Sequence, residues 1–217
     1  MTMPRPFSRR LFLGSAAAFT GLAGFAGFAA APTAVAAGGW SGPVSANGWP
    51  ILTRAGVFAI EGSNHTVALA EGDAATILVH VARRFHYEID SLRDGDLTGF
   101  APDRPVTQPY ESNYLSGTAI AIRAVCYPLG ARGGLYPWEE TVVRDILAEL
   151  GGAVSWGGDE QTPMESHFQL THAPGHPVLQ TAAQRIRSGQ AALGAVDAFA
   201  PDRLEAAQKY RLHSPTG

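Results

Sequence analysis

The chain has 217 residues, with 16 lysines and arginines against 19 aspartates and glutamates, and a formal net charge of −3. This balance argues against a nucleic-acid-binding protein, which normally carries an excess of basic residues on one face. Hydrophobic residues make up 46% of the chain and charged residues 16%, which excludes an intrinsically disordered protein. The single cysteine, Cys126, excludes an internal disulfide.

Residues 1–36 have the features of an export signal. Arg9 and Arg10 precede an uncharged, apolar run that ends in the small-residue cleavage pattern Ala34-Val35-Ala36. The paired arginines favour the twin-arginine export route. An uncleaved membrane anchor is the alternative, because about twenty apolar residues can span a bilayer, but the run is rich in Gly and Ala and contains Pro32. We therefore expect a secreted, extracytoplasmic protein with no stable membrane span after cleavage.

The first half of the mature chain predicts a flexible lead-in at residues 37–48, followed by a folded domain over residues 49–171. Short strands at 57–60 and 66–69 flank a loop that is typical of a hairpin. A helix is expected to begin with Asp73 as its N-cap and to end before Ser91, because apolar residues recur there at helical spacing: Ile77, Leu78, Val81 and Phe85. Residues 94–112 are rich in Gly, Pro, Asp and Ser and predict a loop.

The second half of the chain predicts a buried strand at 118–122, a loop at 127–136 and a second main helix. Pro137 fits the first position of that helix, and Gly151-Gly152 ends it. Strands follow at 154–156 and 167–170, and residues 172–217 predict a peripheral tail with helices near 179–187 and 201–209. This order indicates an α+β fold with a small antiparallel sheet and two main helices.

Two segments combine small residues, polar side chains and a strand. The first is Ser112-Asn113-Tyr114-Leu115-Ser116-Gly117-Thr118-Ala119-Ile120-Ala121-Ile122, and the second is Trp156-Gly157-Gly158-Asp159 followed by His167-Phe168-Gln169-Leu170. Together they resemble the zinc-dependent D-alanyl-D-alanine carboxypeptidases and L-alanyl-D-glutamate endopeptidases, which are peptidases of the bacterial cell wall. In that family the motifs read Ser-x-His-x-x-Gly-x-Ala-x-Asp and Trp-Gly-Gly-Asp, then an acidic residue three positions before His-Phe-Glu/Gln. The resemblance runs from near Trp49 to Leu170 and implies the fold of this family.

The resemblance also implies which positions would hold zinc, and most of them have changed. The family uses the His and Asp of the first motif, the His of the second, and the acidic residue as general base. Here those positions hold Tyr114, Ala121, His167 and Met164 in turn. A catalytic zinc needs three protein ligands and an open position, and a phenol with a pKa near 10 is a poor ligand. We therefore expect a depleted site with no catalytic residue and no zinc, in which His167 is a residual ligand.

A rearranged ligand set is the alternative interpretation. Glu165 and His167 are two positions apart on a predicted strand, so their side chains would share one face. A third ligand could then come from Asp159, Cys126, His172 or His176. In that case the chain would be an active peptidoglycan metallopeptidase.

The leading expectation is a secreted, peptidase-like protein that binds a cell-wall peptide or another short peptide without hydrolysis. By the resemblance, Arg104 would bind a substrate carboxylate, although an ion pair with Asp103 or another neighbour would also explain it. The other groove positions are Ser116, Trp156, Asp159 and Glu165, and Trp156 could instead pack in the core. A third possibility is a partner-binding module that uses residues 171–217 as an interaction tail.

Overall fold

The computed structural model describes residues 39–189 and 198–213, so the predicted export signal and the start of the lead-in lie outside the described residues. The described residues form an α+β fold with small antiparallel sheets and several helices, which confirms the predicted fold class. No helix in this part of the chain is both long enough and apolar enough to cross a membrane.

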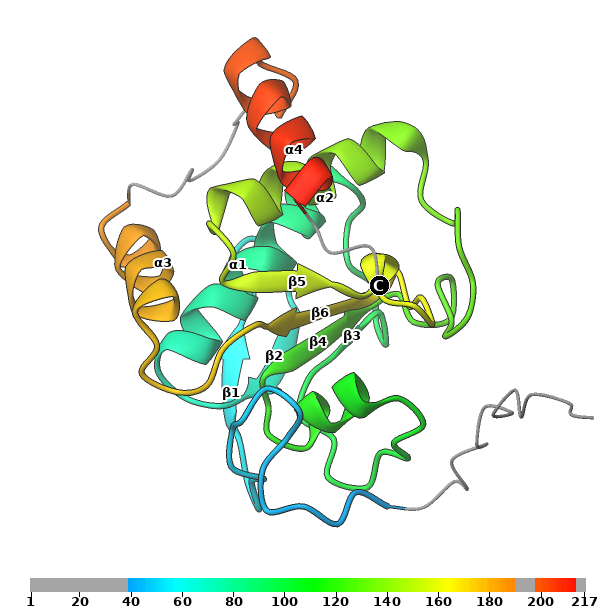
Figure 1. Cartoon of the computed structure of the whole chain (residues 1–217), viewed down its shortest axis with the longest axis vertical. Helices are drawn as coiled ribbons and strands as arrows, with labels where there is room; N and C mark the ends of the chain where they lie inside the picture. The colour runs from blue at the N-terminus through cyan, green and yellow to red at the C-terminus, as the bar shows by residue number, and fades with distance from the viewer. Residues whose placement is uncertain (1–38, 190–197, 214–217) are drawn as a thin grey trace, which may run out of the picture. The chain divides into compact units, whose positions relative to one another are not determined.

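The central sheet has four antiparallel strands in the order β3-β4-β6-β5 (Figure 1). They are β3 (Leu97–Thr98), β4 (Ala119–Ile122), β6 (His167–Leu170) and β5 (Val154–Trp156). A separate hairpin joins β1 (Gly56–Ala59) to β2 (Thr66–Leu69), with Gly56 opposite Leu69. The predicted strands are confirmed to within one or two residues.

The two faces of the sheet pack against different parts of the chain. Side chains alternate along a strand, so β4 and β6 each present residues to both faces. Ile120, Ile122, Phe168 and Leu170 belong to the main hydrophobic core, which they share with helices α1 (Asp73–Glu88) and α2 (Pro137–Glu149). Ala119 and Ala121 belong to a second buried cluster with Tyr110, Tyr114 and Met164. The second face therefore carries Ala119 and Ala121 of the first motif, together with Tyr114.

The ends of α1 and α2 follow the local sequence to different degrees. Pro137 occupies the first turn of α2, and the Glu139 carboxylate accepts a hydrogen bond from the Tyr136 amide at 2.7 Å, as expected for a capping box. Asp73, in contrast, is not the N-cap of α1. Gly72 takes that position with a φ of 82°, and the Asp73 carboxylate instead pairs with Arg187.

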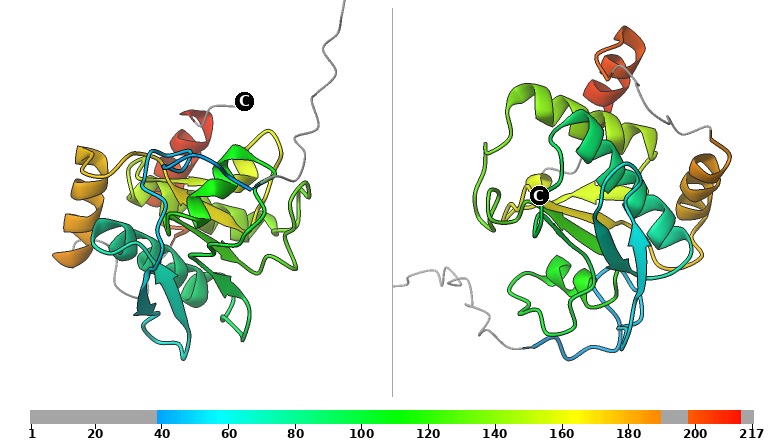
Figure 2. Two further views of the ribbon diagram at one scale, coloured as in Figure 1. Left: turned by 90° about the horizontal axis from the view of Figure 1, so that it is seen from below. Right: turned by 180° about the vertical axis from the view of Figure 1, so that it is seen from behind.

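The C-terminal tail forms two helices, α3 (Pro177–Arg187) and α4 (Pro201–His213), near the predicted positions. Figures 1 and 2 show α3 beside α1 and α4 beside α2. The tail is less peripheral than expected, because α3 buries Leu179, Ala182 and Ala183 in the main core. Tyr210 of α4 donates a hydrogen bond to the Val154 carbonyl at 3.2 Å.

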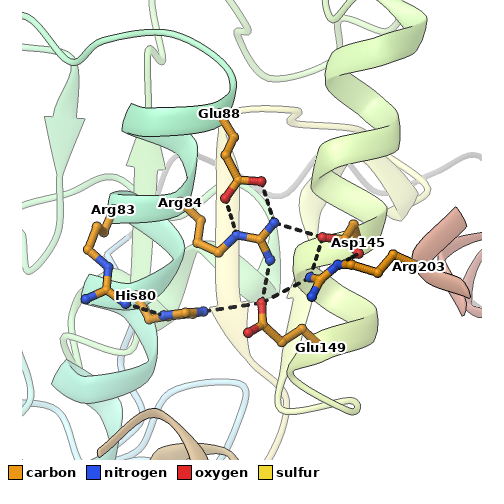
Figure 3. Close-up of polar contacts among 7 residues, drawn as sticks. All are labelled: His80, Arg83, Arg84, Glu88, Asp145, Glu149 and Arg203. Carbon is orange, nitrogen blue, oxygen red and sulfur yellow. Dashed lines mark hydrogen bonds and ion pairs between the residues drawn. The ribbon is translucent and has the colours of Figure 1, made fainter. Parts of the chain in front are cut away.

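A buried network of charges connects α1, α2 and α4 (Figure 3). Arg84 lies at its centre and pairs with Asp145, Glu88 and Glu149. Burial favours loss of the Arg84 charge, but the hydrogen bonds to Glu88 and Asp145 outweigh this effect and raise the pKa of Arg84. Arg203 of α4 binds Asp145 through two nitrogens, at 2.8 and 2.6 Å. The three helices are therefore joined by paired charges as well as by apolar contacts.

Two predicted irregular segments carry structure. The predicted loop 94–112 contains β3 and most of a 3-10 helix, η1 (Pro109–Tyr114), which covers the motif-bearing face of the sheet. Residues 44–48, within the predicted flexible lead-in, contact the domain. Ser45 is buried, and Asn47 donates hydrogen bonds to Thr118 and to the Leu170 carbonyl at 2.9 and 3.0 Å.

Candidate functional site

The sheet face opposite α1 and α2 brings together the four positions that correspond to the ligands and base of the zinc peptidases. Tyr114 ends η1, Ala121 lies on β4, His167 begins β6, and Met164 lies in the segment before it. Ala121 is directly opposite His167 in the β4–β6 register, and the His167 amide donates to the Met164 carbonyl at 2.9 Å. Residues up to 53 positions apart in the sequence therefore form one local cluster.

Both ring nitrogens of His167 are engaged in hydrogen bonds. The Gln169 amide nitrogen donates to the Glu160 carboxylate at 3.2 Å, which turns the Gln169 carbonyl oxygen toward His167. That oxygen can only accept, so Nε2 of His167 carries the proton and donates to it at 3.0 Å. Nδ1 then accepts from the Tyr114 hydroxyl at 2.7 Å.

Burial fixes the protonation states of this pair. The His167 side chain is completely buried, and desolvation lowers its pKa to about 4. Burial also raises the pKa of Tyr114 well above its usual value. At neutral pH the pair is therefore an uncharged imidazole hydrogen-bonded to an uncharged phenol.

These residues do not fit a catalytic zinc. The Tyr114 phenol stays protonated, Ala121 offers only a methyl group, and Met164 offers a buried thioether in place of a carboxylate. The remaining lone pair of His167 already accepts a hydrogen bond from the Tyr114 hydroxyl. Across residues 39–189 and 198–213, no group of three His, Cys, Asp or Glu side chains is close enough together to hold a metal ion.

Glu165 does not join His167, and the expectation that both lie on one strand is wrong. Strand β6 begins at His167, and Glu165 lies in the turn before it. The Glu165 carboxylate accepts hydrogen bonds from three successive backbone amides, those of Gly133, Gly134 and Leu135, at 2.6, 2.8 and 3.3 Å. It thus occupies a backbone anion-binding turn within the same chain.

The other residues considered as replacement ligands lie in separate environments. Both Asp159 oxygens pair with Arg144, and Cys126 is exposed. His172 and His176 stack on each other, with ring centroids 3.8 Å apart, in the segment between β6 and α3. The structure does not bring these residues together around His167.

Arg104 borders the cluster and keeps part of its donor capacity. Its guanidinium lies over the Tyr114 ring, 4.1 Å from the centroid, and pairs with Glu111 at 3.1 Å rather than with Asp103. Its Nε is buried without a hydrogen-bond partner among the described residues. Burial acts to raise the pKa of Glu111, but hydrogen bonds from Thr107, Gln108 and Arg104 outweigh it and lower that pKa. Arg104 is therefore held in place by a charged partner while about a fifth of its side chain stays exposed.

Three of the predicted groove residues, Ser116, Trp156 and Glu165, are buried. The Ser116 hydroxyl donates to the Asn113 carbonyl at 3.1 Å and contacts the Thr118 hydroxyl at 2.8 Å. The Trp156 indole donates to the Glu165 carbonyl at 2.7 Å and belongs to the main core. Neither the Ser116 nor the Trp156 side chain lies at the surface in this structure, whereas Asp159 is partly exposed.

Sequence reasoning missed two side chains that contact the His167 ring, Gln169 and Tyr110. Gln169 was not identified, although it lies two positions after His167 on β6 and therefore on the same face. Tyr110 was missed as well. Its ring centroid is 4.9 Å from that of His167, and its hydroxyl donates to the Thr162 carbonyl at 2.8 Å. The alternation of side chains along a strand could have identified Gln169, but no feature of the sequence indicated that Tyr110 contacts His167.

Comparison of the chain with family models, with curated proteins and with solved structures gave no match. The resemblance to the zinc peptidases therefore rests on the motifs alone.

Proposed function

We propose that this protein is an exported, peptidase-like protein that binds a short cell-wall peptide without hydrolysing it. The observation that supports the proposal is the cluster of Tyr114, Ala121, Met164 and His167. These residues adjoin in space, as a peptidase-like site would require, yet together they lack the donor atoms for zinc. Without a metal to polarise a carbonyl or to activate water, this site has no means of hydrolysis.

Arg104 is the residue we assign to ligand binding. It is partly exposed and borders the cluster, and its position is fixed by Glu111 and by the Tyr114 ring. A guanidinium recognises a carboxylate through charge-assisted hydrogen bonds, so the carboxylate at the end of a peptide is a suitable ligand. No observation in the described residues favours a rearranged zinc set, so an active metallopeptidase is not proposed.

The first test restores the zinc ligands. In a variant with Tyr114→His and Ala121→Asp, three family-type ligands would surround the position next to His167. Tyr114→His also frees Nδ1 of His167 from its hydrogen bond. We expect calorimetry to detect one zinc per chain in this variant and none of comparable affinity in the unmodified protein.

The control adds His167→Ala to the same variant and should abolish the restored zinc binding. A stoichiometric zinc site of sub-micromolar affinity in the unmodified protein would contradict the proposal. Failure of the restored variant to bind zinc, when circular dichroism shows that it is folded, would contradict the resemblance.

The second test measures binding of a short peptide that ends in D-Ala-D-Ala. Arg104→Gln should weaken binding about tenfold or more, because a hydrogen bond to a charged group contributes about 1.5–3 kcal/mol. Arg93→Gln is the matched control, since the Arg93 side chain is 70% exposed in another loop. Hydrolysis of the peptide that disappears in His167→Ala would instead identify the protein as an enzyme.

A further inference from the structure

A hollow lies at the open end of the β1–β2 hairpin, separate from the residues around His167. It has a volume of about 430 Å³, within the usual range for small-ligand sites. Its lining is mostly apolar and includes Trp49, Leu52, Leu69 and Pro174. Arg104 and the other cluster residues do not line it, so it is independent of the proposed peptide site.

The hollow exists because the two segments that extend the hairpin strands, before Gly56 and after Leu69, separate from each other. The Leu52 amide donates to the Leu115 carbonyl at 3.1 Å, and the Ala70 amide donates to the Gly117 carbonyl at 2.9 Å. Both segments are therefore hydrogen-bonded to the 115–117 turn rather than to each other. Gly117 suits this turn, since its φ is 65° and an added Cβ would lie 2.6 Å from the Ala70 nitrogen.

The walls of the hollow are fixed by tertiary contacts. The Trp49 indole donates to the His172 carbonyl at 2.8 Å, which orients the ring. The Leu69 side chain is fully buried in the main core. A ligand would therefore meet walls that are already formed, which reduces the entropy lost on binding.

Two opposite charges line the same hollow and remain unpaired. Arg54 lies two residues before Gly56 and Glu71 lies two residues after Leu69, so one charged residue lies on each side of the open end of the hairpin. Both side chains are exposed and line the hollow, yet within the described residues neither has an ion pair or a hydrogen bond. A site with one cationic and one anionic group around an apolar surface is complementary to a zwitterion with an apolar body.

We infer that this hollow binds a short zwitterionic peptide with apolar side chains, of about dipeptide size. The ligand ammonium pairs with Glu71 and its carboxylate with Arg54, while its side chains pack against Trp49, Leu52 and Pro174. A simple anion would be repelled by Glu71 and a simple cation by Arg54, so a ligand with both charges is favoured over either.

The test uses calorimetry on the full chain with three probes: Leu-Leu, N-acetyl-Leu-Leu and Leu-Leu-amide. Leu-Leu should bind, and Arg54→Gln and Glu71→Gln should each weaken it about twofold to fivefold, the effect of one solvent-exposed ion pair. The effect of Glu71→Gln should vanish for N-acetyl-Leu-Leu, which lacks the ammonium. The effect of Arg54→Gln should vanish for Leu-Leu-amide, which lacks the carboxylate.

Arg93→Gln serves as the control for net charge and should leave all three affinities unchanged. No binding of Leu-Leu at millimolar concentration would overturn the inference. Unchanged affinity in both variants, or equal weakening of all three probes by both, would overturn it as well. Arg104→Gln should have no effect on Leu-Leu, so this test and the test of the proposed function can fail separately.

Discussion

His167 is held as a neutral imidazole, and this state makes the stability of the fold depend on pH. An unfolded histidine has a pKa near 6.5, whereas burial lowers that of His167 to about 4. Between these values the unfolded chain takes up a proton that the folded chain does not. The stabilising contribution of the neutral His167 is therefore fully present above pH 6.5, and it decreases as the pH falls toward 4.

His167→Gln should remove this contribution. In the unmodified protein, His167 should account for a loss of up to about 3 kcal/mol of unfolding free energy between pH 6.5 and 4. The variant should be less stable at pH 7, because it loses the hydrogen bond to Tyr114, but its stability should fall less steeply with acid. Urea unfolding at several pH values measures both slopes, and parallel slopes would contradict the assignment.

At the scale of elements, the segment before Trp49 is part of the domain. The Asn47 side chain joins the first motif to the end of β6 through hydrogen bonds to Thr118 and Leu170. The backbone amide of Asn47 donates to the side-chain oxygen of Asn113. The Ala46 amide donates to Ser112 at 2.8 Å. Residues 44–48 thus support the motif segment from outside the sheet.

A truncation series tests this role. A chain that begins at Trp49 should be about 2–4 kcal/mol less stable than one that begins at Gly39, because several partly buried hydrogen bonds are lost and their partners are left unsatisfied. A chain that begins at Gly42 keeps Ser45 and Asn47 and should match the longer one. Urea unfolding distinguishes these outcomes, and equal stability of all three chains would show that the segment contributes nothing.

The elements that could be predicted are those whose signals are local. The bounds of α2 follow from Pro137 and from Gly151-Gly152, and the buried strand β4 follows from a short apolar run. In contrast, β3 is only two residues long, and η1 depends on packing of Tyr110 and Tyr114 against the sheet. Within the candidate site, the resemblance to the zinc peptidases predicted the four positions, Tyr114, Ala121, Met164 and His167, that lie together. It could not predict that Glu165 faces another loop, because its partners lie 30–32 positions earlier.

At the scale of the whole molecule, the network around Arg84 joins helices that begin 128 residues apart in the chain, α1 at Asp73 and α4 at Pro201. Asp145 is the shared partner, since both Arg84 and Arg203 bind it. Asp145 is almost completely buried, whereas about a quarter of the Arg203 side chain is exposed. Substitution of Asp145 and substitution of Arg203 should therefore destabilise the protein to different extents.

Asp145→Asn should destabilise the protein by about 2–3 kcal/mol, because both Arg84 and Arg203 lose a charged hydrogen-bond acceptor, although Arg84 keeps Glu88 and Glu149. Arg203→Gln should destabilise it by only about 1 kcal/mol, because Arg84 still neutralises Asp145. Thermal and urea unfolding of both variants at neutral pH measures the difference. Equal effects would mean that α4 contributes as much to the network as α1 does.

The carboxylate of Glu165 has a consequence for the order of folding. Residues 127–136 contain no helix or strand, and the amides of Gly133, Gly134 and Leu135 bind an acceptor that is synthesised later than the loop itself. That acceptor lies in the turn directly before β6, which pairs with β4. Because these contacts join segments about 30 positions apart, we expect the loop to become ordered after α2, which follows it directly and has its own local helix signals.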